Sequence, residues 1–312
     1  MKPFRHLCFT LIATKNPQHH AGFPIHILQR KVMSMTSRAM LCPRCGRLIG
    51  SDETVCSWCG ASRTNPWWKA MGWIRGSLRD DWLVHSIITV NIIFYVMSLL
   101  LTRNHSFSLN PLGFLAPGQT SLLLLGASGT IPVDEYGRYW SLLSANYLHG
   151  GILHIVFNLM AFRQIAPWVS REYGDSRMFT IYTIGGVGGY FLSYLAGIPF
   201  TIGASAAICA LIGSLLYYGK SRGGTYGTMV YREVWGWVIS LFLFGFIVPG
   251  INNWAHGGGI ISGILLGVLL GYSEKRPVTP LHHLIAIICG IATIACLTWA
   301  TVGAVAFRFV GG

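Results

Sequence analysis

Seven apolar segments constrain this chain more than any other feature, because each is close to the length of about 20 residues that a helix needs to cross a bilayer. They lie at about 83–102, 147–166, 178–197, 203–218, 234–249, 254–273 and 283–306. Only 11% of the 312 residues are charged, whereas an average soluble domain has about 25%. The chain is therefore predicted to be an all-α polytopic membrane protein rather than a soluble enzyme.

Basic residues orient these predicted spans. Cations precede the first segment and occur after the second, fourth and sixth, while the connections 198–202 and 250–253 contain none. Because cytoplasmic loops are enriched in Lys and Arg, we expect a cytoplasmic N-terminus, an outer C-terminus and a cytoplasmic (inner) membrane. The same flanking cations explain the net charge of +13, so no nucleic-acid partner is expected.

Two Cys-x-x-Cys pairs, Cys42/Cys45 and Cys56/Cys59, stand ten residues apart, and each precedes a glycine. Four thiolates at this spacing suit structural Zn²⁺. The alternative of two disulfides needs an oxidising compartment, which the expected topology does not provide. We therefore predict a zinc ribbon over 41–62 that either docks a cytoplasmic partner or serves as a structural anchor.

The segments flanking this ribbon differ in composition. Residues 1–40 are polar, basic and irregular, which is typical of a disordered leader. Residues 63–82 place tryptophans such as Trp67 and Trp73 among cations such as Lys69. Aromatic and basic residues concentrate at membrane interfaces, so this segment is interpreted as a juxtamembrane linker.

Polar residues inside spans are costly and often mark function. Three groups stand near the expected outer ends of their segments: His149, His154 and Asn158; Gly203, Ala204 and Ser205; and Asn253 and His256. A serine at a helix start lies beside unpaired N–H groups that can stabilise an oxyanion. Taken singly, the serine could serve helix packing, the histidine could be structural, and His154 with Asn158 could form an interhelical polar network.

Small residues at helical spacing would let two of these segments approach closely. They are Gly259, Gly263, Gly267 and Gly271 in the sixth segment, and Gly203, Ala206, Ala210 and Gly213 in the fourth. Such contact would bring Ser205 toward His256. The predicted spans contain no carboxylate, which argues against a buried Ser-His-Asp triad and favours a Ser–His dyad. The loop carboxylates Asp134 and Glu135 stay open as partners.

Three stretches together resemble the rhomboid intramembrane serine proteases: WSLLSANYLHGGILHIVFN (140–158), GASAAICALIG (203–213) and NWAHGGGIISG (253–263). The resemblance covers roughly residues 82–275. It implies a rhomboid-like six-helix core over 83–275, with an extra C-terminal transmembrane helix within 276–312 and the four-cysteine zinc ribbon as an accessory module. It also implies transmembrane protein substrates, cleaved in the lipid bilayer near the outer face without a catalytic cofactor.

The resemblance assigns roles residue by residue. Ser205 is expected to be the nucleophile and His256 the general base. Asn158 and His154, with the Ser205 amide, are expected to bind the oxyanion, and His149 to be a nearby structural residue.

Three positions depart from the family pattern. Ala206 follows the serine where glycine is usual, Cys209 replaces an aromatic residue, and Ser141 follows Trp140 where arginine is usual, although Arg138 is close. These departures keep an alternative open, a weak or inactive rhomboid-like protein that binds membrane clients. A transporter is less favoured, because it would predict internal inverted repeats and ion sites at the midplane, and the sequence shows neither.

Overall fold

The computed structural model describes residues 39–42, 48–57, 60, 62, 81–103 and 114–309. The chain divides into two compact units, Met1–Ser77 and Leu78–Gly312. The predicted leader and juxtamembrane linker lie almost wholly outside the described residues.

The first unit contains a short hairpin. Strand β1 (Ala39–Leu41) pairs antiparallel with β2 (Leu48–Gly50), and Cys42 directly follows β1. Val55, next to Cys56, forms an isolated antiparallel bridge with Ser62. Cys42 and Cys56 are buried in one cluster with Ile49, whereas Cys45 and Cys59 lie outside the described residues.

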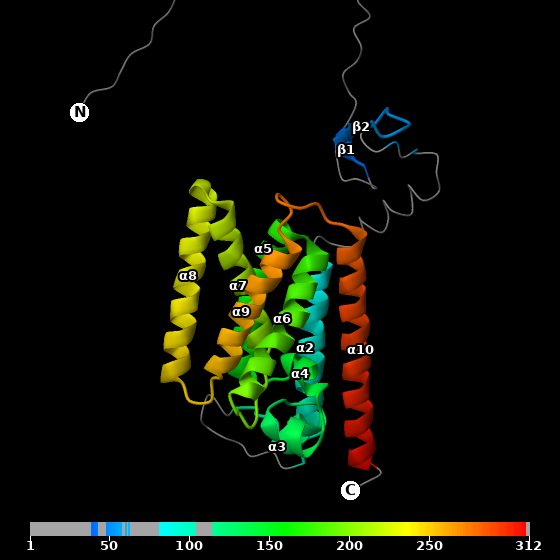
Figure 1. Cartoon of the computed structure of the whole chain (residues 1–312). Helices are drawn as coiled ribbons and strands as arrows, with labels where there is room; N and C mark the ends of the chain where they lie inside the picture. The colour runs from blue at the N-terminus through cyan, green and yellow to red at the C-terminus, as the bar shows by residue number, and fades with distance from the viewer. Residues whose placement is uncertain are drawn as a thin grey trace, which may run out of the picture. The chain divides into compact units, whose positions relative to one another are not determined.

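Seven long helices make up the described part of the second unit (Figure 1). They are α2 (Trp82–Leu100), α5 (Ile152–Tyr173), α6 (Asp175–Leu195), α7 (Ser205–Arg222), α8 (Gly224–Ile247), α9 (Asn253–Leu270) and α10 (Pro280–Phe309). Helices α6, α7 and α9 pack on one another at the centre. Around them, α5 covers α6 and α7, α8 lies against α7, α10 lies against α6, and α2 packs on α5.

Five of these helices, α2, α5, α8, α9 and α10, are long and apolar enough to cross a membrane. Large apolar side chains such as Ile93, Phe246 and Ile291 project outward from them, as expected of surfaces that face lipid. The protein is therefore an integral membrane protein. Helices α6 and α7 do not meet the same criterion, because glycine and polar residues replace large apolar ones where other helices surround them.

Helix bounds differ from the expected segments in two informative places. Helix α5 begins at Ile152, five residues later than predicted, because Gly150 and Gly151 form an extended entry turn. Helix α8 begins at Gly224, ten residues earlier, since its first turns are too polar to register as an apolar run. Helix α5 also continues to Tyr173, beyond the predicted end at 166. Glu172 and Glu233 therefore lie within α5 and α8, which corrects the expectation that the spans contain no carboxylate.

The long connection between α2 and α5 folds into short helices. They are α3 (Gln119–Leu124), the π-helix η1 (Ile131–Glu135), α4 (Ser141–Ser144) and the 3₁₀ turn η2 (Ala145–Tyr147). Arg138 ties the connection together by donating from Nη1 to the Leu123 carbonyl at 2.7 Å. The Ser144 hydroxyl donates to the Gly126 carbonyl at 2.8 Å. This connection lies beside the C-terminal end of α10 (Figure 1).

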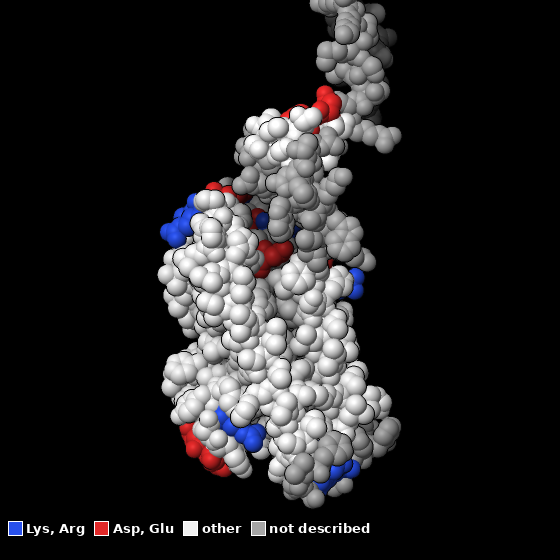
Figure 2. Space-filling model, turned by 90° about the vertical axis from the view of Figure 1, so that its right-hand side faces the viewer, with Lys and Arg blue, Asp and Glu red and all other residues white. Residues whose placement is uncertain are grey.

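Basic side chains gather at one end of the bundle, which we call the basic end. They are Arg171, Arg177, Lys220, Arg222, Lys275 and Arg276, in or beside the α5–α6, α7–α8 and α9–α10 connections. In Figure 2, the charged atoms of the described helices lie toward the two ends of the bundle, and the middle of the visible face is uncharged. We call the opposite end, where α6 meets α7 and α8 meets α9, the site end.

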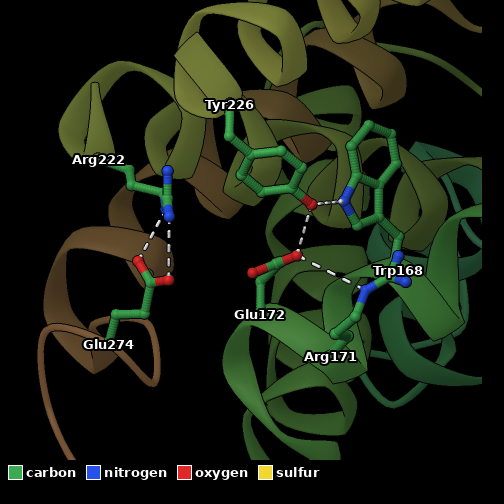
Figure 3. A network of polar contacts seen from close by, with 6 residues as sticks. All are labelled: Trp168, Arg171, Glu172, Arg222, Tyr226 and Glu274. Carbon is green, nitrogen blue, oxygen red and sulfur yellow. Dashed lines mark hydrogen bonds and ion pairs between the residues drawn. The ribbon is translucent and has the colours of Figure 1, made fainter. Parts of the chain in front are cut away.

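A polar network fastens the helices at the basic end (Figure 3). Arg222 of α7 pairs with Glu274 at 2.8 Å. The Tyr226 hydroxyl of α8 donates to Glu172 of α5 at 2.9 Å and accepts a longer bond from Trp168 at 3.4 Å. The network therefore links α5, α7, α8 and the α9–α10 connection at the end opposite the candidate site.

Candidate active site

Ser205 is the first residue of α7, at the site end. The preceding turn is fixed at Gly203, whose N–H donates to the Ala145 carbonyl at 2.9 Å. The Gly203 carbonyl accepts a bond of 2.5 Å from the Tyr190 hydroxyl of α6. Because the first N–H groups of a helix have no intrahelical partner, the Ser205 amide is a donor placed beside its own hydroxyl.

Gly203 also makes room for His154. The φ angle of Gly203 is 128°, which lies in the region that favours glycine. A β-carbon at this position would lie 2.7 Å from His154 Nε2 and 3.6 Å from Ser205 Oγ. The imidazole and the serine hydroxyl therefore border the same small volume, which only a glycine leaves open.

The hydrogen bonds of His154 define its tautomer. Its Nδ1 accepts the Gly150 N–H at 3.2 Å, so in the neutral ring Nε2 carries the proton. That proton faces the Gly203–Ser205 turn. His149 lies in the turn before α5 and packs edge-on against His154, with ring centroids 5.1 Å apart.

Helices α7 and α9 touch directly beneath Ser205 and His256. Gly259, one turn after His256, is so close to α7 that a β-carbon there would overlap the Ala206 carbonyl. The same point would lie 2.9 Å from Cys209 Cβ. Deeper in the bundle, Gly263 meets the Ala210 backbone in the same way. The predicted contact between these two small-residue faces is confirmed.

His256 lies in the first turn of α9 with only 5% of its surface exposed. Its N–H donates to the Asn252 carbonyl at 3.2 Å. Within the described residues its buried Nδ1 has no hydrogen-bond partner, and no hydrogen bond joins its ring to Ser205. Catalytic hydrogen bonds are often loose before substrate binds.

Asn158 is buried in α5, one turn beyond His154 and on the same face. Its amide donates to the His154 carbonyl at 2.8 Å. An asparagine amide has two protons, so one is left to donate elsewhere.

The loop carboxylate Asp134, considered above as a possible partner of the site, accepts a hydrogen bond from the Tyr194 hydroxyl at 2.8 Å.

Two residues that the sequence reading passed over support the site. Tyr190 is buried in one cluster with Ala206 and Ala255, the neighbours of Ser205 and His256. It fills space beside the first turns of α7 and α9. Asn252 caps α9 by accepting the Ala255 N–H at 3.0 Å. Because asparagine is a preferred N-cap residue, this preference could have identified Asn252 from the sequence.

Arg138 lies close to Trp140, the residue that precedes Ser141. Besides its bond to α3, its guanidinium lies 6.0 Å from the Trp140 ring centroid and 5.4 Å from that of Tyr136. The cation therefore remains within the connection, two residues before Trp140 rather than one residue after it.

Residues 136–273 match the family model of the rhomboid domain. This part of the chain is similar to a rhomboid domain. The matched range runs from the end of η1 to just beyond α9, and includes every expected catalytic, oxyanion and structural residue of the site.

Curated relatives carry related names. The rhomboid domain region is similar to RHOMBOID-like protein 4 of Arabidopsis thaliana, with 34% identity over 52% of this chain and 41% of the relative. It is similar to Rhomboid protease GluP of Bacillus subtilis (strain 168), with 34% identity over 48% of this chain and 30% of the relative. Inactive RHOMBOID-like protein 8 of Arabidopsis thaliana is 26% identical over 66% of this chain and 64% of the relative. The matched regions thus cover from under a third to about two thirds of the length of these relatives.

Proposed function

We propose that this protein is an intramembrane serine endopeptidase of the rhomboid family, with Ser205 as nucleophile and His256 as general base. The observation that carries the proposal is the backbone contact of α7 with α9 at Ala206 and Gly259. That contact lies immediately next to Ser205 and one turn from His256. The named bacterial protease among the relatives supports the same activity.

The proposed reaction needs only groups of this chain and water. His256 takes the hydroxyl proton as Ser205 Oγ attacks the scissile carbonyl, and then passes that proton to the leaving amine. The Ser205 N–H, the His154 Nε2–H and the free Asn158 amide proton stabilise the oxyanion. Water, deprotonated by His256, then hydrolyses the acyl ester and restores the serine.

The site end is proposed to face the outer side of a cytoplasmic-type membrane. The cations of the basic end would then lie in the cytoplasm, as the enrichment of Lys and Arg in cytoplasmic loops requires. In this arrangement α6 and α7 also cross the membrane, which gives seven spans with a cytoplasmic N-terminus. Substrates are transmembrane segments that unwind locally at the site end, because a peptide bond within a helix is sterically hidden.

A fluorophosphonate probe tests the nucleophile. The wild-type protein in detergent should be labelled, and Ser205→Ala should not be. The matched control is Ser214→Ala, which removes a buried serine of the same helix whose hydroxyl donates to the Leu211 carbonyl. Labelling that survives Ser205→Ala would refute the assignment.

A second candidate is a weak or inactive rhomboid-like protein that binds membrane clients. It is favoured by the missing hydrogen bond between Ser205 and His256 among the described residues, by Cys209, and by the relative named inactive. Folded protein that binds a transmembrane peptide but neither cleaves it nor takes the probe would support this candidate.

We also propose that residues 41–62 form a structural zinc ribbon held by Cys42, Cys45, Cys56 and Cys59. The buried pair Cys42 and Cys56 beside the β1–β2 hairpin fits such a site. A ribbon limited to 41–62 buries too little apolar surface to fold alone, because domains below about 40 residues usually need a metal or disulfides. Bound Zn²⁺ would supply folding free energy, and the ribbon would offer a docking surface to a cytoplasmic partner.

A further inference from the structure

One asparagine side chain joins the three segments that meet at the site end. Asn252, the cap of α9, accepts the Ala255 N–H at its Oδ1. Its Nδ2 donates to the Ser193 hydroxyl of α6 at 2.6 Å and to the Thr201 hydroxyl at 2.9 Å. Both amide protons are thus engaged outside α9, and a simple helix cap needs neither.

The two residues joined by this contact, Thr201 and Asn252, stand at the same sequence separation from the two proposed dyad residues. Thr201 stands four residues before Ser205, in the connection from α6 to α7. Asn252 stands four residues before His256 and accepts its N–H. Thr201 is itself held by a pair of backbone bonds with Ser128, of 2.7 and 3.0 Å. The strand-like bridge at Thr201 and the start of α9 therefore form one connected unit.

The contact between α7 and α9 needs such a connection. Glycine and alanine faces let two helices approach closely, but such smooth faces offer little resistance to sliding along the helix axes. One residue of axial slip is about 1.5 Å. A misplacement of about 1 Å can cost a hundredfold in rate. A directional hydrogen bond across the two segments opposes such sliding.

We propose that Asn252 is a positioning residue that sets the axial register of His256 against Ser205 through its bond to Thr201. This inference rests on the proposed dyad. Asn252 does not touch the reacting atoms, and acts through Thr201 on one side and the first turn of α9 on the other.

Two substitutions separate this role from helix capping. Asn252→Ser keeps a good cap but is too short to reach Thr201. Thr201→Val keeps the shape of the side chain, removes its hydroxyl and leaves the cap intact. Asn252→Ala removes both functions. Thr301→Val in α10 is the control, because it deletes a hydroxyl that donates only to the Leu297 carbonyl of its own helix.

Hydrogen exchange of the full-length protein, followed by mass spectrometry, measures the connection whether or not the protein is active. Asn252→Ser should speed exchange in 199–206, across the contact from the substitution. Thr201→Val should reciprocally speed exchange in 251–257. If each substitution changes only its own segment, or if only Asn252→Ala has an effect, the residue is a cap and the proposal is wrong.

Cleavage of a model transmembrane substrate supplies the second measurement. Asn252→Ser and Thr201→Val should each lower kcat about tenfold to a hundredfold and change KM less than about twofold. The double variant should be no worse than the worse single one, as expected for two residues acting through one contact. An additive double variant would contradict the shared contact. Wild-type protein that neither cleaves nor takes the probe would refute the dyad, while the exchange result would still decide the connection.

Discussion

The Tyr190 hydroxyl of α6 donates a hydrogen bond to the carbonyl of Gly203, two residues before Ser205. The same side chain packs against Ala206 and Ala255. Helix α6 thus supports the turn before Ser205 through a polar contact, and Ala206 and Ala255 through an apolar one.

Tyr190→Phe should separate these two contributions. The ring stays, and one hydrogen bond to a backbone carbonyl is lost, which costs about 1 kcal/mol of unfolding free energy. We expect kcat to fall about fivefold to tenfold with little change in KM. Tyr194→Phe is the control, since its hydroxyl bonds Asp134 in η1 instead. Equal effects of both substitutions would show that the bond to Gly203 has no special role.

Gly203→Ala should abolish probe labelling. The added methyl group would lie 2.7 Å from His154 Nε2 at a φ that favours glycine. Either the oxyanion donor or the serine turn must then move. Gly236→Ala is the matched control, because nothing lies within 4 Å of that position and alanine suits a helix interior. Normal labelling of Gly203→Ala would show that His154 is not confined to this volume.

Gly259→Ala tests the contact of α7 with α9. The methyl group would meet the Ala206 carbonyl, a backbone atom that cannot move aside cheaply. We expect the helices to separate, with loss of cleavage and an unfolding free energy lower by about 1–3 kcal/mol. Gly303→Ala in α10, where nothing lies within 4 Å, should leave both unchanged. Full activity of Gly259→Ala would contradict the proposed dyad geometry.

Helix α10 should stabilise the connection that carries α4. The Cys296 thiol donates to the Trp140 carbonyl at 3.3 Å, and Ala300 and Ala304 are buried further along the helix. Ala304→Leu should overpack this face, lowering the unfolding free energy by about 1–3 kcal/mol and speeding hydrogen exchange in 119–147. Val302→Leu, on the exposed face, is the control. Unchanged exchange in that segment would show that α10 does not support it.

Cys42→Ser should remove zinc from the first unit without abolishing cleavage. Metal content by atomic emission should fall from about one Zn²⁺ per chain to near zero, because a closed structural site needs four protein ligands. Cys289→Ala, a buried cysteine of α10, should leave the zinc content unchanged. Wild-type protein without zinc would refute the ribbon.

The sequence predicted the parts of the site that short motifs encode. Ser205, His256 and the small faces of α7 and α9 were visible because the residue types and helical spacing carry the signal. Tyr190 was not, because its partner is a backbone carbonyl 13 residues away and no local pattern links the two. Asn252 was passed over for Asn253, since two adjacent asparagines do not reveal which one precedes the first helical turn.

The helix ends were harder to predict than the helices. The Gly150–Gly151 pair moved the start of α5, and the polar first turns of α8 concealed ten of its residues from a hydropathy reading. The ends of α6 and α7 also differ by a few residues from the predicted segments 178–197 and 203–218.

Helix α8 is attached to the rest of the bundle mainly through the half that lies toward the basic end. Its buried residues, Gly227, Val230, Val234 and Val238, all precede its last nine positions. The bond from Tyr226 to Glu172 holds its opposite end. The stretch from Gly227 to Ile247 spans roughly 30 Å at the helical rise. Helix α8 is therefore fastened at the basic end and has no buried residue along its last nine positions at the site end.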